Sequence, residues 1–127
     1  MSTETAKVVR ALVSFTELVI KGLTSSVTNQ LYIDTPELTG FAETNWLPTI
    51  GEPATKPAGT RSFTGITKAQ QDDGIALVNN SYSFPAIVYI TNPVSYILDL
   101  NNGSSAKAPA GFVQTAIAKG IRNTFTR

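Results

Sequence analysis

The stretch Ala86-Ile-Val-Tyr-Ile-Thr-Asn-Pro-Val-Ser-Tyr-Ile-Leu-Asp-Leu-Asn-Asn-Gly-Ser-Ser-Ala-Lys-Ala-Pro-Ala-Gly-Phe112 carries three local signals in succession. Its first five residues, 86–90, are apolar with β-branched and aromatic side chains in the middle, which predicts a central strand buried on both faces. Asn92 before Pro93 is typical of a helix start, because the Asn side chain can accept an orphan backbone N–H and Pro has none to lose. Gly103 predicts where that short helix stops, since glycine tolerates a left-handed backbone.

The N-terminal part of the chain predicts one long amphipathic helix. Ser2 or Thr3 can cap it, and the period allows an irregular continuation toward Ile33. Leu18, Ile20 and Leu23 widen the apolar face beyond one stripe, which fits either a broad core face or contact with a neighbouring subunit. The main stripe follows spacings of four, three and four: Val8, Leu12, Phe15 and Val19.

The middle of the chain predicts short elements separated by turns. We expect a short helix over residues 36–45 and an edge strand over 46–50, because Pro48 cannot donate to a ladder. Trp46 is expected to anchor a core or an interface. Residues 51–63 predict a flexible loop that a partner could order, and residues 66–79 predict a helix that Thr67 could cap.

The last segment, residues 112–127, predicts an amphipathic helix. Val113, Ile117, Ile121 and Phe125 follow one another at i,i+4, and the small residues Ala116 and Gly120 beside them permit close packing. Together the segments predict one domain, residues 1–127, of the α+β class: a long N-terminal helix, a small mixed or antiparallel sheet, short helices and a C-terminal helix.

Composition limits the chemistry that the chain can perform. Its 127 residues include no His and no Cys, which removes the usual general base, the thiolate nucleophile and most metal ligands. Asp72 and Asp73 are adjacent, so on a helix they point about 100° apart and cannot act as a facing carboxylate pair. We therefore expect no catalytic, cofactor or metal site. No apolar run approaches the ~20 residues that cross a bilayer, so no membrane partner is expected either.

Several of these residues together carry a resemblance. Thr39-Gly40-Phe41-Ala42, Asn45-Trp46, Tyr89-Ile-Thr-Asn92, Tyr96, Gly103 and Ala108-Pro109-Ala-Gly111 resemble the tail-completion or head-to-tail joining proteins of tailed bacteriophages, which include neck and tail-terminator proteins. The likeness covers about residues 5–125. It marks Gly40, Trp46, Asn92, Tyr96, Gly103, Pro109 and Gly111 as family-motif positions. The chain departs from the usual pattern at Leu38, where the family commonly has Asp before Thr-Gly.

The resemblance implies a structural, non-enzymatic virion protein, made in the host cytoplasm, that forms a ring at the head–tail junction. Its partners would be copies of itself, with a hexamer as first choice and a dodecamer as second. The phage connector or head-completion protein and the tail tube or tail-terminator protein would lie on either side. Double-stranded DNA would pass through the lumen unread, which the net charge of +1 accommodates.

The candidate subunit interface comprises the apolar faces of the two terminal helices. Its residues are Val8, Leu12, Phe15, Leu18, Val19, Ile117, Ile121 and Phe125. Two other hypotheses remain open at this point: a monomeric peptide- or protein-binding module with an apolar helix groove, and an enzyme built on a Lys or carboxylate pocket.

Overall fold

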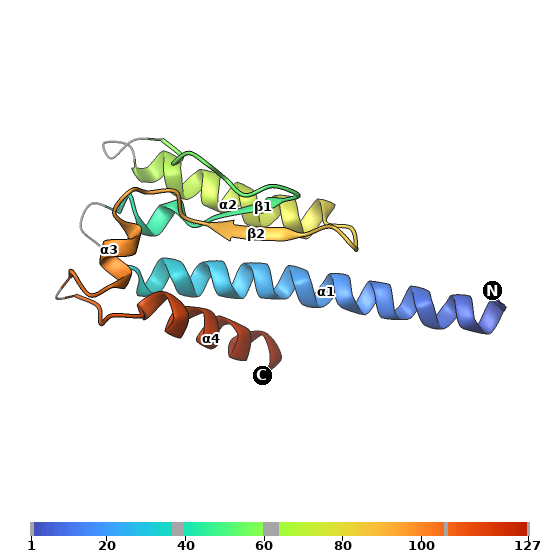
Figure 1. Ribbon diagram of the computed structural model, residues 1–127. Helices are drawn as coiled ribbons and strands as arrows, with labels where there is room; N and C mark the ends of the chain where they lie inside the picture. The colour runs from blue at the N-terminus through green and yellow to red at the C-terminus, as the bar shows by residue number, and fades with distance from the viewer. Residues whose placement is uncertain (1, 37–39, 60–63, 106, 127) are drawn as a thin grey trace.

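The computed structural model describes residues 2–36, 40–59, 64–105 and 107–126, with only the backbone of 64–66. It has the predicted α+β class: a long N-terminal helix, a small antiparallel sheet and a C-terminal helix. Figure 1 shows α1 as the central element, with α4 along one side and the strands and α2 along the other. In chain order the elements are α1 Thr3–Asp34, the 3-10 turn η1 Glu43–Asn45, β1 Leu47–Ile50, α2 Thr64–Ser81, β2 Val88–Thr91, α3 Ile97–Asn101 and α4 Phe112–Phe125.

The first helix is continuous over 32 residues and reaches Asp34 as one element, without the irregularity predicted toward Ile33. Ser2 caps its start, because the Oγ accepts a hydrogen bond from the Thr5 N–H at 3.1 Å. At the other end Thr35 is extended, as expected for the residue before Pro36. Both the N–H and the hydroxyl of Thr35 donate to the Leu31 carbonyl, which satisfies the last turn.

A strand does form here, as β2 over Val88–Thr91, but the prediction that it spans 86–90, is central and is buried on both faces is wrong. The described strands form a two-stranded antiparallel sheet in which Leu47 of β1 pairs with Thr91 of β2, and all four residues of β2 are only half-buried. Ala86 and Ile87 precede the strand, and Ile87 is 60% exposed. The edge strand predicted around Pro48 does form, as β1.

The second helix begins before the residue predicted to cap it. Thr67 lies within α2, is fully buried, and its hydroxyl contacts the hydroxyl of Thr44. One turn further along, the buried Gln71 amide donates to the carbonyls of Glu43 and Trp46, each at 3.1 Å. Two polar residues therefore attach α2 to the segment before β1.

The segment predicted as a helix over 36–45 is helical only in part. Positions 37–39, which include Leu38 and Thr39, lie outside the described residues, and Gly40 has a positive φ of 82°. The described helical turn is η1. The Asn45 side-chain amide connects the segment before η1 to the loop after β1. Its Nδ2 donates to the Phe41 carbonyl, and its Oδ1 accepts from the Ala58 N–H.

The loop after β1 is irregular over its described part, residues 51–59, while residues 60–63 lie outside the described ranges. The Thr91 hydroxyl of β2 accepts a hydrogen bond from the Ala54 N–H at 3.2 Å, and Ala58 donates to Asn45 as above. These bonds tie the loop to the sheet, and its mobility in a free subunit stays a prediction.

The short helix after β2 starts later than predicted. Asn92 does not cap it: its Oδ1 accepts from the Val94 N–H two residues on, and its Nδ2 donates to the Ala42 carbonyl. Helix α3 begins at Ile97 instead. Its end is as predicted, because Gly103 has a φ of 97° and donates to the Leu100 carbonyl while Ser104 donates to the Asp99 carbonyl.

The core consists of two adjoining clusters at one end of the molecule. The first joins the segment after α1 to α3 and α4 through Phe41, Ala42, Val94, Leu100 and Phe112. The second joins α1, α4 and the Trp46 side chain through Val27, Leu31 and Ala116. The predicted anchoring role of Trp46 is correct, and its indole Nε1 donates to the Thr35 hydroxyl at 2.7 Å.

Candidate functional site

The N-terminal end of α1 extends beyond the rest of the molecule (Figure 1). We call residues 3–19 of α1 the rod. Its base is attached to the body by Glu17, whose carboxylate accepts a hydrogen bond from the Phe84 N–H at 2.9 Å. Most side chains of the rod are exposed. Beyond this base, the rod is helical because it continues a packed helix and begins at a capped end.

Large apolar side chains cover much of the rod. Val8, Leu12 and Phe15 are 58%, 61% and 64% exposed, and Leu18 is 68% exposed. Val19, at the base, is half-buried. Complete burial of one such side chain contributes about 1.5–3 kcal/mol, and the single chain leaves most of this unused. Val8, Leu12 and Phe15 therefore form one exposed apolar strip along the rod, with Leu18 on its flank and Val19 at its base.

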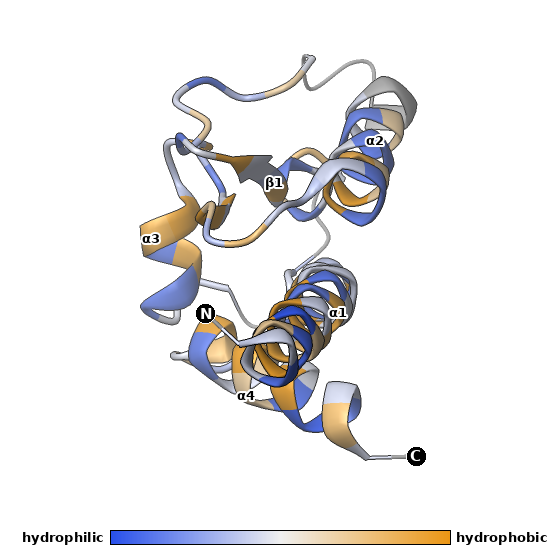
Figure 2. Cartoon of the chain, turned by 90° about the vertical axis from the view of Figure 1, so that its right-hand side faces the viewer, coloured by the Kyte–Doolittle hydropathy of each residue, from blue (hydrophilic) through white to orange (hydrophobic). Residues whose placement is uncertain are grey.

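The strip on the rod continues the face of α1 that packs against α4. Phe15, Val19, Gly22 and Ser26 follow at spacings of four, three and four, which places them on one side of the helix. Gly22 faces Thr124 of α4, and the Ser26 hydroxyl donates to the Gly120 carbonyl. Figure 2, which looks along α1 from its N-terminal end, shows apolar residues on the side of α1 that faces α4.

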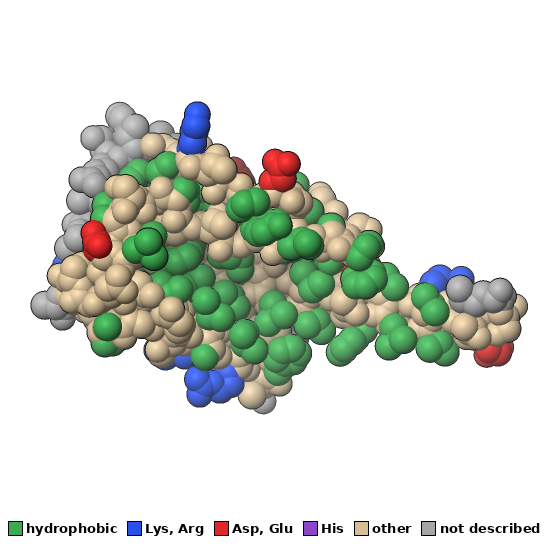
Figure 3. Space-filling view, viewed as in Figure 1, with side chains coloured by type: hydrophobic (Ala, Val, Ile, Leu, Met, Phe, Trp, Pro, Cys, Tyr) green, Lys and Arg blue, Asp and Glu red, His purple; other side chains and the backbone are tan. Residues whose placement is uncertain are grey.

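A groove of about 420 Å³ lies beside this face, between β2, α1 and α4. Apolar side chains line nearly all of it. Ile20, Leu23, Thr24 and Val27 form its floor, Ala86, Ile87, Val88 and Ile90 one wall, and Ile121 the other. Figure 3 shows groups of hydrophobic side chains over the centre of the molecule and along the rod, with other atoms between them. We call these nine residues the groove.

The two apolar rows of α4 have different roles. Phe112, Ala116 and Gly120 form a buried row. Ala116 and Gly120 pack against α1, where their small size allows the helices to approach closely, whereas Phe112 belongs to the first core cluster. The predicted interface row, Ile117, Ile121 and Phe125, is exposed. Ile121 lines the groove, so the structure joins this row to the apolar surface of α1.

The family-motif residues gather at the other end of the molecule, away from the rod. Gly40, Trp46, Asn92 and Tyr96 lie around the first core cluster and its neighbour, and Gly103 faces the turn that leads into α4. Gly111, with a φ of 79°, precedes the first residue of α4. All of them shape turns or fill the core, which is a structural role.

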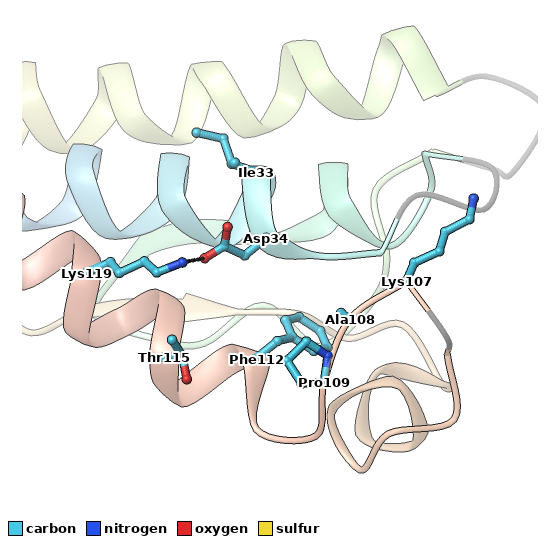
Figure 4. A pocket seen from close by; sticks show the side chains of 8 residues that line it. All are labelled: Ile33, Asp34, Lys107, Ala108, Pro109, Phe112, Thr115 and Lys119. Carbon is cyan, nitrogen blue, oxygen red and sulfur yellow. Dashed lines mark hydrogen bonds and ion pairs between the residues drawn. The ribbon is translucent and has the colours of Figure 1, made fainter.

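A second, more polar pocket of about 270 Å³ lies beside this end (Figure 4). Pro109 lines it together with Lys107, Phe112 and Thr115. Lys119 and Asp34 form an ion pair across it at 3.3 Å, with the carboxylate largely covered. The ion pair joins the end of α1 to α4. The described residues contain no group of three or more His, Cys, Asp or Glu side chains placed to hold a metal ion.

Comparison with protein-family models, with curated proteins and with solved structures gives no match. None of the helices in the described ranges combines the length and the apolar character needed to cross a bilayer. Sequence reasoning singled out the rod residues but missed Ala86 and Ile87, because the apolar run that contains them was interpreted as a buried strand. The groove is therefore the part of the site that only the structure provides.

Proposed function

We propose that the chain is a structural, non-enzymatic subunit that assembles with copies of itself into a ring at the head–tail junction of a tailed phage. The motif resemblance supplies the setting. The observation that carries the assembly is the exposed apolar surface of the rod, the groove and the exposed row of α4. Large exposed apolar surfaces of this kind mark interaction sites in soluble proteins.

The surface suits a ring because its parts differ. The rod is convex and projecting, whereas the groove is concave and lies on the body. Contacts between two different surfaces of identical subunits are head-to-tail, and they close into a ring when the rotation per subunit permits. A hexamer remains the first choice and a dodecamer the second.

The neighbours of the ring would be the connector or head-completion protein on one side and the tail tube or tail-terminator protein on the other. The net charge of +1 supports passage of DNA without tight binding, because phosphate contacts that hold DNA require clustered Lys and Arg. In this proposal the family-motif residues keep the subunit's shape, and the terminal helices make its contacts.

A monomeric peptide-binding module is the second candidate, and the groove is the observation that favours it. An apolar trough of about 420 Å³ beside a helix could accept the apolar face of a partner's amphipathic helix. The two functions predict different oligomeric states, which the native mass of the purified protein distinguishes. The module stays a single chain at micromolar concentration, whereas the ring subunit forms a closed oligomer alone or with its neighbours.

Disruption of the gene in a phage that carries it tests the proposed function. We expect lysates with DNA-filled heads and finished tails that are not joined, as seen by electron microscopy. A plasmid copy of the gene should restore joined particles. Infectious, joined particles from the disrupted phage would refute the head–tail role.

A further inference from the structure

We infer that the rod of one copy lies in the groove of the next copy around the ring, an inference that rests on the proposed function. The occupant of the groove is thus a second copy of this chain, and the contacting segment is residues 3–19. The rod has an apolar strip that its own chain leaves uncovered, and the groove is an apolar trough that its own chain leaves open.

The two surfaces match in length. The groove floor runs from Ile20 to Val27, and the rod strip runs from Val8 to Phe15. Both intervals are two turns of helix, roughly 11 Å at about 1.5 Å per residue. A rod laid along the groove therefore places Val8, Leu12 and Phe15 over the floor together, between the walls formed by Ile87 and Ile121.

The rod cannot fill the groove of its own chain. The groove floor belongs to the same continuous helix, so folding back would break α1 between Val19 and Ile20. Four rod side chains expose on the order of 100 Å² each, roughly half of the ~800 Å² that each partner of a standard interface buries. The remainder is available from the flanks of the rod and from the exposed row of α4.

A contact between two rods alone would leave the groove open to water. Rod in groove covers both apolar surfaces with one repeated contact and gives every copy the same neighbours on either side. It also explains why α1 is much longer than α4, its partner within the chain, which covers only the C-terminal half of α1 (Figure 1).

Two variants separate the partners of this contact. The rod variant Leu12→Glu/Phe15→Glu keeps the groove intact, and the groove variant Ile87→Glu/Ile121→Glu keeps the rod intact. All four side chains are exposed, so each variant should fold, which circular dichroism and the fluorescence of the single Trp46 verify. The matched control Leu77→Glu/Leu98→Glu changes two exposed leucines outside both surfaces.

Native mass spectrometry and sedimentation of the full chain give the readout. We expect the wild type and the control to form a closed oligomer larger than a dimer, and each variant alone to stay monomeric, with association weakened at least about 100-fold. Mixing the two variants should yield one-to-one pairs, because the rod of one meets the groove of the other. A groove variant that still assembles, a control that dissociates, a mixture that stays monomeric, or a wild type that is monomeric or stops at a dimer would each overturn the inference.

This experiment and the gene disruption fail independently. If the two variants pair but the disrupted phage still makes joined particles, the contact between copies is confirmed and the head–tail role is refuted. Loss of joining in the disrupted phage without pairing of the variants would keep the role and refute the contact.

Discussion

The two halves of α1 have similar apolar patterns but different surroundings. In the C-terminal half, the face that carries Gly22 and Ser26 packs against α4. In the N-terminal half the same face continues with Val8, Leu12 and Phe15 largely exposed. The helix stays regular through both halves, so packing is not needed at every turn once one half is anchored. Burial therefore separates the contacts within the chain from those that we assign to a neighbour.

We call the C-terminal half of α1, which packs against α4, the packed half. Its stability should depend most strongly on the contact between Gly120 and Val27. A Cβ at Gly120 would lie 2.6 Å from the Val27 Cα and 3.0 Å from its N, and backbone atoms cannot move aside. We expect Gly120→Val to lower the free energy of unfolding by about 3 kcal/mol or more, because α4 must separate from α1. Denaturant titration followed by Trp46 fluorescence measures this loss.

The control for that substitution is Gly22→Ala, because Gly22 lies on α1 where that helix faces α4. A Cβ there meets only the Thr124 methyl group at 3.4 Å, an ordinary contact. Since Ala also favours helix, we expect a change within about 1 kcal/mol, in the stabilising direction. Equal unfolding midpoints for Gly120→Val and wild type would show that the two helices are not closely packed.

A substitution at Thr35, which follows the last residue of α1, should cause the next largest loss in the free energy of unfolding. The Thr35 hydroxyl is buried, donates to the Leu31 carbonyl at 2.6 Å and accepts from the Trp46 indole at 2.7 Å. Thr35→Val removes the acceptor and leaves the buried indole N–H without that partner. We expect a loss of about 2 kcal/mol in the free energy of unfolding, measured by the same titration.

Thr126→Val is the control at the end of α4. The Thr126 hydroxyl makes the same local bond, to the Arg122 carbonyl at 2.8 Å, but it is exposed. Water can replace that bond, so the change should stay within about 0.5 kcal/mol. A Thr35→Val loss no larger than this would mean that the indole bond does not stabilise the fold.

The sequence predicts the local features well because their causes are local. The Ser2 cap, the strand at Pro48 and the stop at Gly103 each depend on a few neighbouring residues, and the structure has all three. The same reasoning failed at Asn92 and Thr67. Both side chains bond groups distant in the sequence, the Ala42 carbonyl and the Thr44 hydroxyl, and these bonds cannot be inferred from spacing.

The candidate site was predictable only in part for a related reason. Apolar periodicity identifies a face of a helix but not what covers it, so the rod strip has the same pattern as a core strip. Likewise the run that contains Ile87 has the composition of a buried strand, although Ile87 lies on the open wall of the groove. Exposure depends on which elements meet in three dimensions, and apolar periodicity does not determine this.

We expect the smallest change in the free energy of unfolding from Thr→Val, made once in each half of α1. Thr28, in the packed half, is fully buried, and its Oγ has no hydrogen-bond partner among the described residues. Thr28→Val replaces that hydroxyl with a methyl group of similar shape, and we expect it to raise the free energy of unfolding by about 1 kcal/mol. In the rod, the hydroxyl of Thr16 donates to the Leu12 carbonyl at 2.8 Å and is open to water, so Thr16→Val should change stability by less than about 0.5 kcal/mol. Thermal and denaturant unfolding of both variants at a concentration where the protein is monomeric provide the comparison.

A destabilised Thr28→Val would mean that its hydroxyl is satisfied by bound water, and the packed half would then contain a polar contact that the rod lacks.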